Sequence, residues 1–496
     1  AAGNRIRAVC GGGAGEIPPV VSLIIPPSAF LLDERVFMTL GVLKVAAVLE
    51  RAGVRVEMLD LSGIRNYEDA VRDHARATEA LHFGLTATTP QMPAAARIAR
   101  ALREARPDAR LILGGPHVTL VHAAARREGK AGVRGGRAER ALDQLRGMFD
   151  RLVVGDGEEA VFRAIAADAP PLVDADDPGS GLFLSEAELD AAPFPARHLV
   201  DVASYRYAVD GERALSLIAQ LGCPFECGFC GGRLSPSLRR VRMRSAARVV
   251  EEMEGMHRDW GVRGFMLYDD ELNVNRGMVD LMDRIRAAQD RCGEAWRLRG
   301  FIKAQLFTEE QARAMAQAGF RWILVGFESG APRILENINK RATREENTRC
   351  LEIARRHGLK VKALMSIGHP GETPGTIAET RDWLLATRPD DFDVTIITTY
   401  PGTPYYDHAV PRSDRPGEWV YTYARTGDRL YSVPIDYMEQ ADYYKGAQGS
   451  YEAYVYTDGL GRQLRTTLKN PEGVDQETLY SYDRAGNLAL VQAPDP

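Results

Sequence analysis

Three cysteines lie within eight residues of the chain, in the run CPFECGFC that begins at Cys223 and ends at Cys230. Cysteine thiolates hold iron–sulfur clusters, and a 4Fe–4S cube normally takes four of them. A short loop that offers only Cys223, Cys227 and Cys230 leaves one iron open. The open iron can bind another molecule, so the spacing indicates a cluster that does chemistry.

Two other readings of these cysteines are open. A structural zinc site takes four protein ligands, often as two Cys-x2-Cys halves, and neither a second half nor a nearby His follows this loop. Three buried, inert thiols are the second alternative, although half of the six cysteines fall within this loop. The remaining Cys10, Cys292 and Cys350 are scattered, which predicts a reducing compartment rather than a disulfide framework.

The loop resembles the signature of radical S-adenosylmethionine (SAM) enzymes, Cys-x3-Cys-x2-Cys with an aromatic residue before the last Cys. The resemblance implies that Cys223, Cys227 and Cys230 hold a 4Fe–4S cluster whose open iron chelates the amino and carboxyl groups of SAM. It also implies that one electron cleaves SAM to a 5′-deoxyadenosyl radical, and that Phe229 packs beside the adenine.

Length and composition are those of a multidomain globular protein. At 496 residues the chain has room for about three domains. Its net charge of −5 gives no electrostatic case for a nucleic-acid partner. No apolar run reaches the ~18 residues that span a bilayer, so the sequence predicts a cytoplasmic protein without a membrane partner.

After a glycine-rich arm at 1–18, residues 19–168 alternate short apolar runs with helical patterns. The expected strands are Val20–Ile25, Val54–Asp60, Ala80–Leu85, Ala109–Leu113 and Leu152–Val154. The expected helices are Gly41–Arg51, Tyr67–Thr78, Gln91–Glu104 and Glu158–Ala167. This order predicts an α/β fold with a doubly wound, Rossmann-like parallel sheet, on which ligands bind beyond the carboxyl ends of the strands.

Three of these strands run into polar, glycine-rich loops. Glycine lets a ligand approach the backbone closely, and hydroxyls can bond its polar groups. One Gly-Gly after a strand is more often a turn, but three such loops on one edge predict a ligand crevice. No Gly-x-Gly-x-x-Gly follows the first strand, so the crevice is not a dinucleotide site. Its candidate contacts are Thr86, Thr88, Gly114, Gly115, His117, Gly155, Gly157 and Glu158.

This module, placed before a radical SAM loop, is similar to the cobalamin-binding domain of cobalamin-dependent radical SAM enzymes. The similar phrases are TLGVL at 39–43, LGGPH at 113–117 and GDGEE at 155–159. The resemblance implies that the crevice holds cobalamin. The Asp-x-His-x-x-Gly motif of methionine synthase-type proteins is absent, so we expect cobalt without a protein His ligand. For His117, a backbone hydrogen bond and a cofactor contact stay equally open.

A segment rich in Pro, Asp and Gly at 169–207 is expected to link this module to a second one at 208–420. The second module alternates strands with helices six times. Its expected strands are Leu215–Leu221, Gly264–Leu267, Arg297–Ile302, Trp322–Val325, Val361–Ile367 and Phe392–Ile397. Six such repeats predict a partial (β/α)6 barrel with reactive groups at the carboxyl ends of the strands, and the cysteine loop follows the first.

Polar residues also follow the later strands of this barrel. Adjacent carboxylates at Asp269 and Asp270 could receive an ammonium group, although such pairs more often mark an exposed turn. The phrase Arg242-x-Arg244-Ser245 is similar to the family's as well, but a helix start capped by Ser explains it. By resemblance to the radical SAM family, the SAM contacts are Phe229, Asp269, Asp270, Arg299, Glu328, Ser329, Ile367, Gly368 and Tyr400.

Within those contacts the resemblance assigns parts of SAM to residues. Asp269 and Asp270 would face the amino group or the ribose, and Arg299 the carboxylate. Glu328 and Ser329 would lie near the ribose and methionine. The adenine would lie near Phe229, Ile367, Gly368 and Tyr400.

Together the resemblances imply an enzyme that uses a 4Fe–4S cluster, SAM and cobalamin. The favoured activity is transfer of a methyl group from methylcobalamin to an unactivated carbon, or a phosphorus, of a small molecule. A reduced flavodoxin or ferredoxin-like protein would donate electrons. Such a scheme demands no general base, so no catalytic residue is named.

Three alternatives remain. The same cofactors could serve a radical cyclisation, ring contraction or oxidation. A cobalamin or cluster sensor without turnover would need no SAM pocket, which the polar strand ends argue against. A methylthiotransferase needs three upstream cysteines for another cluster, and only Cys10 lies upstream.

The resemblance ends near residue 420, before a C-terminal region at 421–496. Two Tyr-x-Tyr units begin at Tyr454 and Tyr480, about 26 residues apart, and resemble YD repeats of secreted shell-forming toxins. Two repeats are too few to bury a core. We expect this region to be an appendage without a catalytic part.

Overall fold

The structure, a computed structural model, describes residues 20–28, 31, 33–415 and 417–432 and the backbone of four strands between 452 and 492. The chain divides into two compact units, residues 1–434 and 435–496. The first unit contains two parallel sheets, and both of the predicted modules lie within it.

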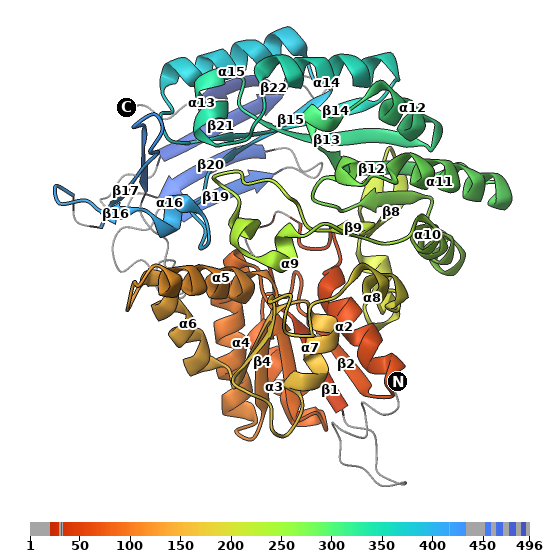
Figure 1. Ribbon diagram of the computed structural model, residues 1–496, viewed down its shortest axis with the longest axis vertical. Coiled ribbons are helices and arrows are strands. Elements are labelled where there is room, and N and C mark those ends of the chain that lie inside the picture. Colours follow the sequence, from red (N-terminus) through yellow and green to blue (C-terminus); the bar gives the residue numbers. More distant parts are fainter. Residues whose placement is uncertain are drawn as a thin grey trace. The chain divides into compact units, whose positions relative to one another are not determined.

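The first sheet has six parallel strands in the order β2-β1-β3-β4-β5-β6. It lies in the red to orange part of the ribbon in Figure 1. Its strands are β1 (Val20–Ile25), β2 (Arg55–Asp60), β3 (His82–Thr86), β4 (Arg110–Gly114), β5 (Arg151–Gly155) and β6 (Leu172–Ala175). All six residues of β1 are buried, as expected for an apolar strand with neighbours on both sides. The strand order reverses at β1, which opens a crevice beyond the strand ends there. The predicted doubly wound sheet is confirmed.

Helices cover both faces of this sheet. They are α2 (Leu40–Arg51), α3 (Tyr67–Ala77), α4 (Met92–Ala105), α5 (Pro116–Lys130), α6 (Arg137–Met148) and α7 (Gly157–Ala164). α2 packs beside α7, whereas α3 packs beside α4 and α6 contacts both α4 and α5. His117 was expected in a loop but lies in the first turn of α5, because Pro116 starts that helix with a preset φ.

One strand more than the sequence predicts completes the sheet. β6 lies in the segment expected to be a linker, and it pairs in parallel with β5 from Leu172 opposite Leu152. The strand has only four residues, LVDA, which is too short a run to show a period. The rest of the segment holds α8 (Glu186–Ala191) and the short turns η2 (Arg197–Leu199) and η3 (Val202–Ser204).

The second sheet has the order β15-β14-β13-β12-β11-β8-β7. Its strands are β7 (Ala208–Val209), β8 (Glu212–Leu217), β11 (Gly264–Leu267), β12 (Arg297–Ile302), β13 (Phe320–Glu328), β14 (Lys360–Ile367) and β15 (Asp391–Ile396). The strands from β8 to β15 run parallel, and only the short β7 is antiparallel to its neighbour. This sheet confirms the predicted partial barrel of six parallel strands.

Helices follow the strands of the partial barrel. They are α10 (Ala246–Trp260), α11 (Met278–Cys292), α12 (Glu309–Gln317), α13 (Pro332–Asn337), α14 (Arg344–Arg356) and α15 (Pro374–Thr387). Ser245 caps α10 by accepting a hydrogen bond from the Arg248 amide, as the sequence predicts. One continuous cluster of buried apolar side chains includes residues of both sheets and of the segment between them.

The first predicted strand of the barrel is interrupted before the cysteine loop. β8 ends at Leu217, and a separate β9 (Gln220–Leu221) pairs antiparallel with β10 (Arg242–Met243). The cause is the carboxylate of Asp269, whose Oδ1 accepts hydrogen bonds from the amides of Ala219 and Gln220 at 2.9 and 2.5 Å. The stretch between β9 and β10 contains the cysteine loop, the turn η4 (Gly231–Leu234) and α9 (Pro236–Arg239).

Beyond the barrel, α16 (Pro404–Asp407) leads to a small antiparallel sheet of β16 (Val410–Pro411), β17 (Trp419–Thr422) and β18 (Arg429–Ser432). In the second unit the structure describes four antiparallel strands, β19 (Glu452–Thr457), β20 (Gln463–Lys469), β21 (Gln476–Tyr482) and β22 (Leu488–Gln492). The Tyr-x-Tyr pairs lie in β19 and β21, and the remaining residues of the two repeat-like units, 458–462 and 483–487, lie outside the described part. None of the helices described is long and apolar enough to cross a membrane.

Candidate functional site

Backbone hydrogen bonds hold the cysteine loop from several sides. The Cys223 amide donates to the Leu238 carbonyl at 3.0 Å, and the Cys230 amide donates to the Cys227 carbonyl at 3.1 Å. The Gly228 amide donates to the Ile338 carbonyl at 2.7 Å. The loop is therefore fixed by segments from both the strand β10 side and the α13 side of the barrel.

The donor set of the loop suits an iron–sulfur cluster. Burial, together with the nearby Glu271, Asp270 and Cys230, raises the pKa of the Cys223 thiol to about 12. A thiolate in such a place is costly unless a cation accompanies it, and iron ions supply that positive charge. Among the residues described, no three His, Cys, Asp or Glu side chains converge on a single metal ion.

Two buried lysines stand beside the loop. The Lys303 Nζ lies 4.1 Å from the centre of the Phe225 ring, and the Lys340 Nζ lies 5.8 Å from that of Phe229. Burial alone would lower the pKa of Lys340, but Glu328 and the Cys227 thiol raise it above the usual range. Both rings belong to the cysteine loop, so the loop has a positive charge close to each of its two aromatic residues.

A chain of polar contacts leads away from Lys340 at the barrel mouth. Lys340 Nζ lies 3.0 Å from Glu328 Oε1, and the Ser366 hydroxyl donates to Glu328 Oε2 at 2.8 Å. Ser366 also lies 2.7 Å from His369 Nε2, and the His369 ring centre is 5.6 Å from that of Phe229. Glu328 has a φ of +65°, a left-handed conformation that a non-glycine residue keeps only when its surroundings hold it.

The acidic residues after β11 take different positions. Asp269 is buried and holds the backbone before the cysteine loop, as described above. Burial raises its pKa to about 7 against the opposing effect of the two amides. Asp270 lines a cavity, described below, and burial raises its pKa as well. Glu271 has a pKa raised to about 7 by burial, which Lys340 and Lys303 oppose.

Two other predicted SAM residues, Arg299 and Ser329, contact side chains of the barrel itself. Arg299 is the third residue of β12, and its guanidinium lies 5.7 Å from the Trp322 ring. The Ser329 hydroxyl is buried, pairs with Thr380 at 2.9 Å and accepts from the Ala331 amide at 3.1 Å.

The predicted adenine residues follow β14 and β15. Ile367 ends β14, and Gly368 follows it with a φ of +91°. An added Cβ at Gly368 would stand 3.2 Å from Ile397 Cγ2. Burial raises the pKa of the Tyr400 hydroxyl.

A cavity of about 420 Å³ opens where the strand ends of the first sheet face the cysteine loop side of the barrel. Seven of the eight predicted cobalamin contacts line it: Thr86, Thr88, Gly114, Gly115, Gly155, Gly157 and Glu158. The second module contributes Gln220, Leu221, Gly222, Leu238, Tyr268 and Asp270 among others. One cavity is thus shared by the two modules.

Glycines near the strand ends of the first sheet take part in shaping this cavity. At Gly41 an added Cβ would meet no protein atom within 4 Å, so a side chain there would take up free space in the cavity. Gly115 has a φ of +95°, and a Cβ there would stand 2.5 Å from Thr86 Oγ1. Glu158 is neutralised by Lys44, whose Nζ lies 2.7 Å from its Oε1. These features suit a large, mostly uncharged ligand such as a corrin ring.

His117 is the predicted contact that does not line the cavity. Its Nδ1 lies 3.1 Å from Thr89 Oγ1, and burial lowers its pKa to about 4, so the ring is neutral near pH 7. Its Nε2 has no hydrogen-bond partner among the residues described.

Sequence reasoning passed over several residues of this region. Lys340 follows Asn339 in a loop without a recognisable motif. Lys44 lies in a predicted helix, where nothing in the sequence distinguishes it from other polar residues. Arg242 was noticed but explained by the Ser245 cap alone. Its guanidinium in fact forms a buried ion pair with Asp156 of the first sheet. Ion pairs between distant segments leave no local pattern in a sequence, which is why these residues were missed.

Comparison with known proteins agrees with this architecture. Residues 34–146 match the B12 binding domain, and residues 217–384 match the radical SAM superfamily. An uncharacterized methyltransferase of Pyrococcus horikoshii is 28% identical over 347 residues, which cover 66% of this chain and 69% of the relative. An anaerobic magnesium-protoporphyrin IX monomethyl ester cyclase of Rubrivivax gelatinosus is 26% identical over 369 residues, covering 71% of this chain and 62% of the relative.

A solved structure has the same fold. The radical SAM methyltransferase TsrM from Kitasatospora setae, with cobalamin and a 4Fe–4S cluster bound, aligns with a TM-score of 0.62 at 19% identity. The alignment covers 84% of this chain and 87% of TsrM. A cobalamin-binding sheet followed by a radical SAM partial barrel defines the cobalamin-dependent radical SAM enzymes. This chain joins a B12 binding domain to a radical SAM domain in the same order, and its cofactors are a 4Fe–4S cluster, SAM and cobalamin.

Proposed function

We propose that this enzyme transfers a methyl group from methylcobalamin to an unactivated carbon, or a phosphorus, of a small molecule. The observation that carries the proposal is the shared cavity. Its walls combine the strand ends of the cobalamin-binding sheet with residues that flank the cysteine loop, so both cofactor regions border one space.

When bound, the cluster supplies the electron that cleaves SAM, and cobalamin supplies the methyl group. The residues of the chain position and insulate these groups. Cys223, Cys227 and Cys230 would hold the cluster. Lys303 and Lys340 place positive charge beside it, which stabilises an added electron.

Residues of both modules support binding of the other two groups. Glu328, fixed by Lys340 and Ser366, offers a carboxylate at the barrel mouth where an ammonium group of SAM can bind. Asp270 lies on the cavity wall itself. The glycines after β4 and β5 allow a macrocycle to approach the backbone.

A second candidate function has support from one comparison. The Rubrivivax relative is named a cyclase, and it covers a larger part of this chain than the Pyrococcus methyltransferase does. A radical cyclisation or oxidation would use the same residues for the cluster and for SAM. The two activities differ in whether a methyl group from SAM appears in the product.

The test uses anaerobically reconstituted protein with SAM that carries a labelled methyl group and a reduced flavodoxin or ferredoxin-like donor. Methyl transfer predicts label in a small-molecule product or on cobalamin, together with 5′-deoxyadenosine. Release of 5′-deoxyadenosine without any transfer of label favours the cyclase class. Protein that binds no cobalamin under these conditions contradicts the proposal.

The cluster assignment has its own test. Cys227→Ala should reduce iron per chain to background and abolish SAM cleavage, because a cube cannot be held by two thiolates. Cys292→Ala, at an exposed cysteine at the end of α11, is the matched control and should keep both. SAM cleavage that survives in Cys227→Ala would remove the assignment.

A further inference from the structure

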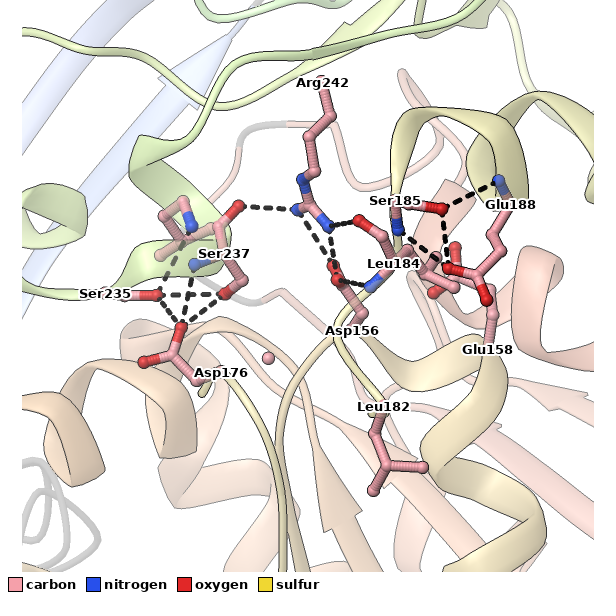
Figure 2. A network of polar contacts seen from close by, with 12 residues as sticks. Asp156, Glu158, Asp176, Leu182, Leu184, Ser185, Glu188, Ser235, Ser237 and Arg242 are labelled. Carbon is pink, nitrogen blue, oxygen red and sulfur yellow. Dashed lines mark hydrogen bonds and ion pairs between the residues drawn. The ribbon is translucent and has the colours of Figure 1, made fainter. Parts of the chain in front are cut away.

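Two carboxylates of the first sheet reach into the stretch that follows the cysteine loop. Asp156 comes directly after β5, and Asp176 directly after β6. The stretch from Ser235 to Arg242, called here the bridging segment, contains α9 and the start of β10. Figure 2 shows Asp176 facing the Ser235 end of this segment and Asp156 facing the Arg242 end.

The Asp176 carboxylate binds the beginning of the bridging segment. Its Oδ1 accepts three hydrogen bonds: from the Ser235 hydroxyl at 2.5 Å, the Ser237 hydroxyl at 2.7 Å and the Ser237 amide at 2.9 Å. Asp176 is fully buried. A carboxyl group so far from water stays in place only with such donors, so this anchor has little freedom to move.

The Asp156 carboxylate binds the end of the segment through Arg242. The guanidinium meets both carboxylate oxygens, with Nη2 at 3.0 Å from Oδ1. It also donates to the carbonyls of Leu184 and Ser237 at 3.0 and 2.8 Å. Both side chains are buried, and the guanidinium lies 4.3 Å from the Phe183 ring. A bidentate pair of this kind fixes direction as well as distance.

The opposite side of the same segment holds the cysteine loop. The Leu238 carbonyl accepts the Cys223 amide at 3.0 Å, and Arg242 pairs with Leu221 across β9 and β10. At Gly222 an added Cβ would stand only 2.2 Å from the Arg240 carbonyl oxygen, so the two backbones are in direct contact. Ser237, Leu238 and Arg242 also line the shared cavity.

We propose that the bridging segment sets the separation between cobalamin and the iron–sulfur cluster, with Asp156, Asp176 and Arg242 as positioning residues. The inference rests on the proposed function for its purpose, since methyl transfer needs both cofactors at a fixed spacing from one substrate. Whether the segment fixes this spacing can be tested without any catalytic reaction. The two anchors tie the segment to the strand ends that border the cobalamin cavity, while its backbone holds the loop that bears the cluster.

The first test measures the spacing without catalysis. Holoenzyme with a reduced cluster and cob(II)alamin contains two unpaired spins, and their magnetic interaction, read by electron paramagnetic resonance, reports the distance between them. Asp176→Asn and Arg242→Lys should each weaken or broaden this interaction relative to the unmodified protein. The matched controls are the exposed neighbours, Asp177→Asn and Arg240→Lys, which should leave it unchanged. Iron and cobalt per chain are measured for every variant.

The second test covers variants that do not load both cofactors. In the cofactor-free protein, backbone amides of residues 235–242 should exchange with deuterium at least about tenfold faster in Asp176→Asn than in Asp177→Asn. Ser237→Ala, which removes a single hydroxyl, should show a smaller increase. Unchanged exchange in Asp176→Asn, or an unchanged spin interaction in fully loaded Asp176→Asn and Arg242→Lys, would overturn the inference.

Turnover separates this inference from the proposed function. If methyl transfer occurs, the positioning variants should release several-fold more 5′-deoxyadenosine per methylated product than the controls do. If the unmodified protein transfers no methyl group, the proposed function fails, and the spin interaction still decides whether the segment sets the spacing.

Discussion

At the scale of single residues, the buried ion pair of Lys340 and Glu328 makes a testable contribution to stability. Both side chains are nearly inaccessible, and their charged atoms lie 3.0 Å apart. Lys340→Met would leave the Glu328 carboxylate buried without its cation, which costs about 3 kcal/mol of unfolding free energy. The measurement is urea unfolding followed by circular dichroism.

The control for that variant is another Lys→Met change at an exposed pair. Lys360 pairs with Asp210 at 3.4 Å on the surface, and Lys360→Met should change the free energy of unfolding by less than about 1 kcal/mol. Adding Glu328→Gln to Lys340→Met should recover part of the loss, because no charge then stays buried. Equal effects of the two lysine variants would contradict the burial argument.

Titration of His117 should make the free energy of unfolding depend on pH. Burial lowers its pKa to about 4 in the folded chain, against about 6.5 when unfolded. Between these values the unfolded chain binds the proton and the folded chain does not, so stability falls as the pH is lowered from 7 to 4. At pH 5 this one residue should cost about 2 kcal/mol relative to pH 7.

The comparison is between His117→Gln and the exposed His198→Gln. Measured by urea unfolding at pH 7 and pH 5, His117→Gln should lose less stability on acidification than the unmodified chain does, because the titrating group is gone. His198→Gln should lose as much as the unmodified chain. An identical pH dependence in all three proteins would show that the His117 ring is not held neutral.

The sequence predicts residues of the candidate site only where residues of the right type lie close together in the chain. Cys223, Cys227 and Cys230 carry their signal within eight residues, and the glycines after β4 and β5 follow apolar strands directly. Asp269 was identified by the same rule, yet its carboxylate serves the backbone of Ala219 and Gln220. The direction of a side chain depends on partners far away in the sequence, and a local pattern does not contain them.

At the scale of elements, β5 and β6 approach each other so closely that only glycine fits at the end of β5. Gly155 has a φ of +81°, and an added Cβ would stand 2.4 Å from the backbone carbon of Ala175. Gly53 has nearly the same φ, +82°, but no atom within 4 Å of such a Cβ. Both glycines have the same backbone strain. They differ in that only at Gly155 would an added Cβ overlap other backbone atoms.

Gly155→Ala should therefore destabilise the chain clearly more than Gly53→Ala does. The strain common to both costs about 1 kcal/mol. The collision at Gly155 cannot be relieved by a rotamer change, because it involves backbone atoms, so β6 must shift. Thermal unfolding of the two variants measures the difference, and cobalamin binding should weaken only in Gly155→Ala. Similar melting temperatures would contradict the close approach.

The sequence predicts a strand or helix correctly where the element's own residues show a clear hydrophobic pattern. The bounds of β11 and β12 match the predicted strands residue for residue, since β11 is a short apolar run and the buried residues of β12 alternate with partly exposed ones. β6 was missed because its four residues are too few to show a period, and it becomes a strand only through pairing with β5. The split between β8 and β9 depends likewise on Asp269, a residue of another strand end.

At the scale of the whole molecule, the cofactor machinery and the C-terminal sheet belong to separate compact units. The cysteine loop, the shared cavity and the bridging segment all lie between residues 20 and 432. The four strands of the second unit pair with one another in sequence order. No strand of the second unit completes either parallel sheet among the pairings described.

A chain that ends at residue 434 should therefore keep its cofactors. Iron and cobalt per chain after anaerobic reconstitution should equal those of the 496-residue protein, because every residue that we assign to either site is retained. The control is a chain that ends at residue 396, which keeps the six parallel strands but removes Tyr400 and Tyr405, the latter buried beside His369. That shorter chain should lose iron. Loss of either metal from the 434-residue chain would assign the C-terminal strands a part in cofactor binding.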